Sequence, residues 1–242
     1  MPERLAQTEV APEQVAEALR DVSRIGGFFA LDTAPTRSSG AGAGAEVEAE
    51  VDADARLVRA GLAERAQAVN DHYRTPEPRI GVSIAHLGLA ARLWSPVLAC
   101  ALVHGIVPTM SAVEWSGEGS AIRLRRPEGR RAAELPSLAD AVHEQVDGVL
   151  EAVENALTTK VAPRLLAGNS ASALVGSAAQ LLRSRPELRT DLTRLTRELL
   201  ETGRLRGTGR ITGADLSFRR RSCCLFYRAP GGGKCGDCCL VR

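Results

Sequence analysis

Five of the six cysteines of this 242-residue chain lie in residues 223–242, and this cluster constrains the chain more than any other feature. Four of them, Cys223, Cys224, Cys235 and Cys238, follow the spacing C-C-x10-C-x2-C. Thiols this close together bind a metal ion or an iron–sulfur centre more often than they pack in a core, because thiolates need a cation to offset their charge. The C-terminal segment therefore carries the strongest functional prediction.

The composition is that of a soluble globular protein with one substantial core, since 44% of the residues are hydrophobic and 25% are charged. Aromatic residues make up only 3%, so a base-stacking surface for nucleic acid is not expected. Residues 1–6 lack the basic and apolar regions of a secretory signal, which predicts a cytoplasmic chain. In a reducing compartment, clustered cysteines are poor candidates for disulfides, and a metal centre is favoured.

An apolar stretch over residues 80–108 is not expected to span a membrane. Arg92 lies near its middle, Pro96 interrupts it, and His86 and His104 add polar groups. We predict instead two buried helices joined near residues 95–96, with Pro96 at the first position of the second helix. No transmembrane segment is expected, although the sequence allows peripheral association with a membrane.

Apolar periodicity predicts helices over residues 12–25, 57–73, 137–160, 164–182 and 186–202, the third capped by Ser137. Residues 33–55, rich in Ser, Gly, Ala and acids, predict a flexible insert. Two short strands, at residues 112–115 and 121–125, flank Gly117-Glu118-Gly119 and predict a hairpin. The expected fold class is α+β: a mainly helical domain over residues 1–205 with one small antiparallel sheet, followed by an irregular C-terminal segment, residues 206–242, that binds the metal centre.

The spacing alone leaves zinc and a two-iron cluster open as the occupant of the cysteine segment. Zinc ribbons use two C-x2-C pairs, whereas only Cys235 and Cys238 have that spacing here. Cys223 and Cys224 are adjacent, and adjacent side chains point apart in an extended backbone, which modestly favours the wider ligand spread of a [2Fe–2S] cluster. Cys239 is either a spare thiol or a replacement for Cys238. The sixth cysteine, Cys100, lies in an apolar helix and is predicted to pack in the core.

Basic and glycine residues surround the cysteines, and each group has two interpretations. Positive charge would favour the reduced form of a [2Fe–2S] centre, which is more negative than the oxidised form, but a solvated basic surface explains the same residues equally well. The basic residues are Arg219, Arg220, Arg221, Arg228 and Lys234. The run Pro230-Gly231-Gly232-Gly233 either lets backbone N–H groups approach sulfur or forms a flexible loop.

Motifs for other cofactors are incomplete. Cys235 follows Gly233-Lys234 where a phosphate-binding loop needs Ser or Thr, and no dinucleotide fingerprint is present. The four histidines are scattered along the chain, so we expect them in the core or on the surface and not as metal ligands: His72, His86, His104 and His143. Electrons are therefore expected to come from another protein.

The cysteine segment resembles the C-terminal signature of the FhuF-type ferric-siderophore reductases. In the body of the chain, Asn169 is a weaker point of similarity to the same family. The resemblance implies that Cys223, Cys224, Cys235 and Cys238 ligate a [2Fe–2S] cluster. It also implies an enzyme that passes one electron to a ferric siderophore of the hydroxamate type and releases Fe(II) in the cytoplasm. The implied partners are the ferric siderophore and a protein electron donor of the ferredoxin or flavin reductase type, with no nucleic acid. Cys239 departs from the pattern.

Two other functions fit the cysteine segment. The first is an iron–sulfur or zinc redox sensor whose arginine-rich tail binds nucleic acid, against which the sparse aromatic residues and the absence of a helix-turn-helix pattern count. The second is an electron carrier without a small-molecule substrate, which the tail alone does not distinguish from a reductase.

Overall fold

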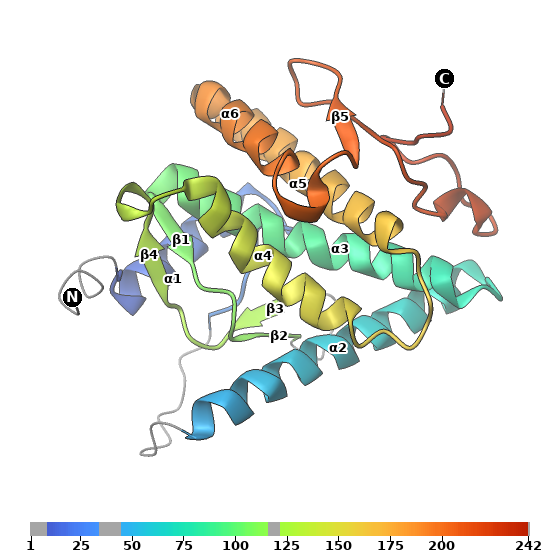
Figure 1. Ribbon diagram of the computed structural model, residues 1–242, viewed down its shortest axis with the longest axis horizontal. Coiled ribbons are helices and arrows are strands. Elements are labelled where there is room, and N and C mark those ends of the chain that lie inside the picture. The colour runs from blue at the N-terminus through green and yellow to red at the C-terminus, as the bar shows by residue number, and fades with distance from the viewer. Residues whose placement is uncertain (1–8, 34–44, 116–121, 242) are drawn as a thin grey trace.

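A computed structural model describes residues 9–33, 45–115 and 122–241, with the side chains of residues 45–57 and 59 left out of the description (Figure 1). In these residues, helices α3 and α5 lie at the centre and the other helices pack around them. The α-helices are α1 (Pro12–Val22), α2 (Ala45–Tyr73), α3 (Pro78–Ala99), α4 (Leu138–Glu154), α5 (Pro163–Ser184) and α6 (Arg189–Leu200). The predicted fold class, a mainly helical domain with small antiparallel structure and an irregular cysteine segment, is confirmed, but one sheet was expected and the described strands form three separate pairs.

Buried polar groups join α3 to α5 and are paired with one another. Trp94 is fully buried and donates its indole N–H to the hydroxyl of Ser170 at 3.0 Å. The hydroxyls of Ser95 and Ser177 are hydrogen-bonded at 2.7 Å. A buried polar group left without a partner would be destabilising. These two pairs therefore fix how the two central helices face each other.

Pro96 does not separate two helices, so the prediction of a break near residues 95–96 is wrong. Helix α3 continues through Pro96 to Ala99 and then widens into a π-helical turn, Cys100–His104. A proline inside a helix removes one hydrogen bond and costs about 3 kcal/mol. Residues 93–100 are all buried, and burial of several large apolar side chains at about 1.5–3 kcal/mol each outweighs that cost.

Helix α2 begins earlier than predicted. Residues 45–55 were expected to belong to a flexible insert, but they form the first turns of α2, and this part of the prediction is wrong. Residues 45–55 are all Ala, Glu, Val or Asp; alanine and glutamate are strong helix formers, and acidic residues near a helix N-terminus are favoured by the helix dipole. Residues 34–44 of the expected insert lie outside the described residues.

The remaining helix predictions are confirmed with small changes at the ends. The side chain of Ser137 caps α4 by accepting a hydrogen bond from the N–H of Asp140 at 3.1 Å. This helix ends at Glu154 and does not continue toward Lys160. The predicted helix over residues 186–202 is a 3₁₀ turn, Pro186–Leu188, followed by α6.

The strands form three separate antiparallel pairs. The predicted hairpin is present as β2 (Val113–Trp115) paired with β3 (Ile122–Leu124), and its turn, residues 116–121, lies outside the described residues. Strand β1 (Ile106–Pro108) pairs with β4 (Gly129–Arg131) in the body of the protein. In the C-terminal segment, β5 (Gly209–Ile211) pairs with β6 (Phe218–Arg220), a hairpin that the sequence did not predict because it lacks apolar alternation.

Two helical stretches are long and apolar enough to cross a membrane by length and composition, Pro78–His104 and Pro163–Ser184. Both are mostly buried inside the protein. In the most apolar 18 residues of each stretch, the buried share is 67% and 78%, respectively. They are the central helices α3 and α5, and their packing within the core accounts for their apolar character.

Candidate iron–sulfur site

The C-terminal segment lies across α5 and the turn between α2 and α3, where it appears in red in Figure 1. The rings of Phe226 and Tyr73, the last residue of α2, meet edge to face with centroids 5.6 Å apart. A guanidinium nitrogen of Arg228 lies 3.0 Å from a carboxylate oxygen of Glu77. The helical body therefore holds the cysteine segment on both sides of the α2–α3 turn.

A glycine on α5 lets the segment approach closely. A Cβ atom at Gly168 would lie 2.0 Å from Oγ of Ser222 and 3.1 Å from Nη2 of Arg220. Ser222 directly precedes Cys223, so this contact sets how near the first cysteine lies to the helix. It also places the Arg220 guanidinium against α5, beside Gly168.

Substitution of Gly168 by alanine is expected to push the segment away from α5. Overpacking of this kind costs about 1–3 kcal/mol, so we expect a midpoint of thermal unfolding several degrees lower and a smaller fraction of metal-loaded protein. Gly176→Ala is the matched control. Gly176 lies on the same helix as Gly168, but a Cβ there would have no neighbouring atom within 4 Å. Equal midpoints and equal metal contents for the two variants would contradict the account.

A chain of buried hydrogen bonds connects the segment to both central helices. Arg220, on β6, donates from Nη2 to Oδ1 of Asn169 at 2.7 Å. The Asn169 amide donates to the carbonyl and hydroxyl oxygens of Ser83 at 2.9 and 3.2 Å. The Ser83 hydroxyl donates to the backbone carbonyl of Cys224 at 2.7 Å. The chain links α5, α3 and a cysteine.

The Arg220 side chain is a buried cation that lacks a counter-charge. The residue is 2% exposed, and its Nε and Nη1 atoms have no hydrogen-bond partner. Among the described residues, no carboxylate forms an ion pair with it. An unpaired buried charge costs several kcal/mol. A negatively charged centre on the neighbouring thiolates would supply the missing charge, so this residue fits an anionic iron–sulfur cluster.

Two of the four thiols, those of Cys224 and Cys235, lie close together. The thiol of Cys224 donates to the sulfur of Cys235 at 3.4 Å, close to the roughly 3.7 Å that separates two thiolates on one tetrahedral ion with metal–sulfur bonds of about 2.3 Å. In the described part of the chain, no three Cys, His, Asp or Glu side chains gather closely enough to hold a single metal ion. The separation of Cys224 and Cys235 fits two ligands of one metal centre and does not by itself distinguish one zinc ion from a two-iron cluster.

Backbone N–H groups point at two of the sulfurs in the same way. The N–H of Leu225 lies 3.3 Å from Sγ of Cys223, and the N–H of Leu240 lies 3.4 Å from Sγ of Cys238. Leu225 has φ = 67°, a left-handed conformation that bends the chain directly after Cys224. This bend directs the Leu225 N–H back toward the sulfur of Cys223.

Burial and mutual proximity make the thiols hard to ionise without a metal. The pKa of Cys223 is raised, chiefly by burial and also by Cys224, Cys239 and Cys238, while the Leu225 N–H acts in the opposite direction. The pKa of Cys235 is also raised, first by burial and then by Cys224 and Asp237. Thiolates form here when a cation offsets their charge, as expected of a metal-binding group.

The two remaining cysteines differ from these four. Cys100 is fully buried in the core, and burial, with a contribution from Asp21, raises its pKa to about 12. The core prediction for Cys100 is confirmed. Cys239 is partly exposed, and within the described segments no backbone N–H is directed at its sulfur. That contrast with Cys238 favours Cys238 as the ligand.

The basic and glycine residues near the cysteines do not act as one group. Arg220 is buried, Arg228 pairs with Glu77, and Arg221 and Lys234 are exposed. Gly232 is required by close packing, since a Cβ there would lie 2.2 Å from the carbonyl oxygen of Phe226. Sequence reasoning missed Ser83 and gave Asn169 little weight, because neither lies near the cysteines along the chain.

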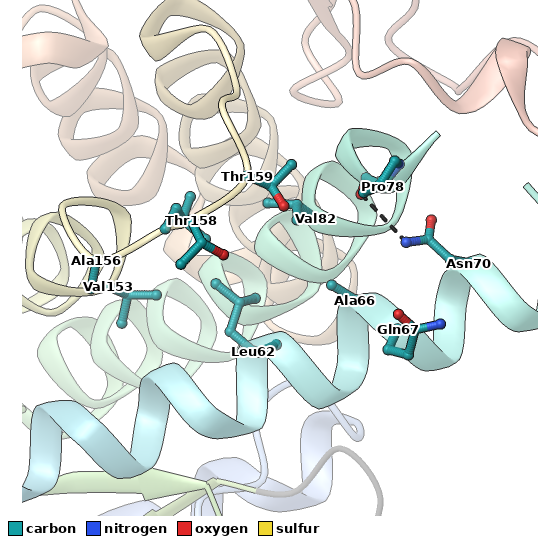
Figure 2. Close-up of a pocket in the computed structure, with 12 residues that line it drawn as sticks. Leu62, Ala66, Gln67, Asn70, Pro78, Val82, Val153, Ala156, Thr158 and Thr159 are labelled. Atoms are coloured by element: carbon teal, nitrogen blue, oxygen red, sulfur yellow. Dashed lines mark hydrogen bonds between the residues drawn. The ribbon is translucent and has the colours of Figure 1, made fainter. Parts of the chain in front are cut away.

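A cavity of about 210 Å³ lies between α2, the start of α3 and the loop after α4 (Figure 2). The Asn70 amide donates to the carbonyl of Pro78 at its edge, at 3.4 Å. Its lining is apolar apart from Gln67, Asn70, Thr158 and Thr159, and none of the lining residues is titratable. This cavity therefore offers no group for metal binding or proton transfer.

Comparison with known proteins connects this geometry to a family at the C-terminus. The family of the FhuF 2Fe-2S C-terminal domain matches residues 220–240. The match begins at the buried arginine and includes all five cysteines of the segment. Searches of curated proteins and of solved structures found no match to the chain. The segment is thus a [2Fe–2S]-binding domain of this type.

Proposed function

We propose that this protein, whose residues 220–240 are a FhuF 2Fe-2S C-terminal domain, is a ferric-siderophore reductase. The observation that carries the proposal is the family match of residues 220–240, in a segment that the buried chain of hydrogen bonds from Arg220 to Cys224 holds against the helical body. In the proposed reaction, one electron passes to the Fe(III) of a siderophore of the hydroxamate type. Fe(II) is then released in the cytoplasm.

Cys223, Cys224, Cys235 and Cys238 are the proposed ligands. A [2Fe–2S] cluster bound by them supplies one-electron redox chemistry at low potential. The chain's own residues hold these thiols in place: Ser83 fixes the backbone at Cys224, and Ser172 donates a hydrogen bond to Asp237, beside Cys238. The N–H groups of Leu225 and Leu240 stabilise negative charge on their sulfurs.

Reduction releases the iron because of ligand preference. Siderophore oxygens are hard ligands that hold Fe(III) much more tightly than Fe(II), so adding one electron weakens the chelate. No covalent bond has to break, which agrees with the scattered positions of the histidines and the lack of a nucleophile–base motif in the sequence. The proposed electron donor is a separate protein of the ferredoxin or flavin reductase type.

The proposal predicts that a ferric hydroxamate reoxidises the reduced protein. Protein purified without oxygen is reduced with dithionite, freed of excess reductant and mixed with the chelate and a chromogenic Fe(II) chelator. We expect the visible spectrum of the oxidised protein to return while one Fe(II) is captured for each electron delivered. Protein that stays reduced in the presence of the chelate would contradict the reductase function and leave the carrier or sensor function.

A further inference from the structure

A hollow of about 680 Å³ opens beside Cys238. Its walls are one face of α5, the β5–β6 hairpin and tail residues 236–238. The volume lies in the range of about 300–1,000 Å³ that small-molecule sites occupy. We propose that this hollow docks the ferric chelate and prefers neutral or anionic chelates to cationic ones, an inference that rests on the proposed function.

Three guanidinium groups line the hollow without a hydrogen bond or ion pair to a described residue, although the charge of Arg183 acts on Asp215 from a distance. Arg183 on α5, Arg210 on β5 and Arg219 on β6 all line it. None of the three has a side-chain hydrogen bond or an ion pair with any residue in the described ranges. Guanidinium groups bind oxygen anions through several N–H donors at once. Free arginines around one hollow therefore favour a ligand that presents oxygen atoms and negative charge.

The two carboxylates in the same hollow are already engaged. Asp237 accepts a hydrogen bond from the hydroxyl of Ser172. Asp215 accepts from the hydroxyl and the N–H of Ser217 at 2.6 and 3.0 Å, which lowers its pKa, with a smaller contribution from Arg183. Both carboxylates thus accept hydrogen bonds from nearby serine residues, and the hollow has three arginines against two aspartates.

The hollow also brings a ligand next to the redox centre. Cys238, which is 6% exposed, forms part of its wall, so a chelate bound there would lie against a proposed cluster ligand. Apolar side chains complete the lining and suit the organic arms of a siderophore: Val175, Ala179, Leu216, Phe218 and Val241. The electron balance is simple: the reduced protein loses one electron, the Fe(III) of the chelate gains it, and no bond is made or broken in that transfer.

Binding can be tested without electron transfer by using Ga(III) in place of Fe(III), because Ga(III) is not reduced under these conditions. Three Ga(III) chelates of one trihydroxamate core serve as probes, with a pendant ammonium, acetamide or carboxylate group. Each is titrated calorimetrically into the oxidised, cluster-loaded protein. We expect the carboxylate form to bind about tenfold more tightly than the ammonium form, with the acetamide form between them.

The double variant Arg183→Gln/Arg210→Gln removes two of the free guanidinium groups. We expect its dissociation constant for the carboxylate form to rise about tenfold, and the preference among the three probes to fall to within about twofold. Arg194→Gln/Arg197→Gln is the matched control, since it removes two exposed charges from α6, which does not line the hollow. Both double variants should keep the visible spectrum and the unfolding midpoint of the unaltered protein.

An unchanged order of affinities in the Arg183→Gln/Arg210→Gln variant, or no binding of any probe to the unaltered protein, would overturn the docking site. The reductase function is judged separately with the corresponding Fe(III) chelates. Reoxidation that proceeds with no change in KM for the double variant would overturn the docking site alone. Selective binding of the Ga(III) probes without reoxidation by the Fe(III) chelates would keep the docking site and overturn the reductase.

Discussion

Replacement of Cys224 by serine is expected to leave a folded protein that no longer holds its cluster. Cys224 is buried, its sulfur lies 3.4 Å from that of Cys235, and its carbonyl is fixed by Ser83. Residues that only orient a metal ligand change metal affinity by about 10–100-fold, so loss of a ligand should have at least that effect. Iron and acid-labile sulfide per chain, together with visible absorption, should fall more than about tenfold, while the far-ultraviolet circular dichroism stays unchanged.

Two other cysteines provide controls. Cys239→Ser should keep the colour, because no backbone N–H in the described residues is directed at that thiol. Cys100→Ser tests the general effect of placing a hydroxyl at a buried cysteine; it should destabilise the fold by about 1–3 kcal/mol and still bind the cluster. Full iron content in Cys224→Ser, or loss of the cluster in Cys239→Ser with retention in Cys238→Ser, would contradict the ligand assignment.

Removing the buried charge of Arg220 is expected to lower the reduction potential of the bound cluster. The reduced centre is more negative than the oxidised one, so a nearby cation stabilises the reduced form and raises the potential. For two unit charges about 8 Å apart at an effective dielectric constant near ~20, Coulomb's law gives about 2 kcal/mol. For a one-electron couple this corresponds to a shift on the order of 50–100 mV.

The measurement is a spectroelectrochemical titration of Arg220→Met, with two comparison variants. Arg220→Lys keeps the charge and should recover most of the potential, which a merely structural role for the guanidinium would not explain. Arg221→Met removes an exposed charge at the next position, where solvent screens it, and should shift the potential much less. Equal potentials for Arg220→Met and the unaltered protein would rule out Arg220 as the counter-charge.

The sequence predicted the helices with strong apolar periodicity and the place of the metal centre, because both signals are local. Ser137 capped its helix as expected, and the cysteine spacing identified the domain that the family comparison also found. The proline rule failed at Pro96 because tertiary burial of residues 93–100 outweighed one missing hydrogen bond. Residues 45–55 were misjudged because an Ala- and Glu-rich segment suits a helix as well as a loop.

The buried chain behind the cysteines could not be predicted in the same way. Asn169 lies between Ser83 and Arg220, which are 86 and 51 residues from it along the chain. Their contact depends on how α3, α5 and β6 pack, and no spacing along the sequence encodes that packing. Arg220 was therefore grouped with its exposed neighbours, although only Arg220 among Arg219, Arg220 and Arg221 is buried.

The most direct test of the central claim, that the C-terminal thiols hold a redox-active pair of irons, is Mössbauer spectroscopy of protein grown on ⁵⁷Fe and purified without oxygen. We expect the oxidised protein to show only a diamagnetic pair of high-spin ferric sites with sulfur ligands. After one-electron reduction, the spectrum should show one ferric and one ferrous site. A preparation that contains zinc but no iron, or iron in a mononuclear site, would contradict the claim.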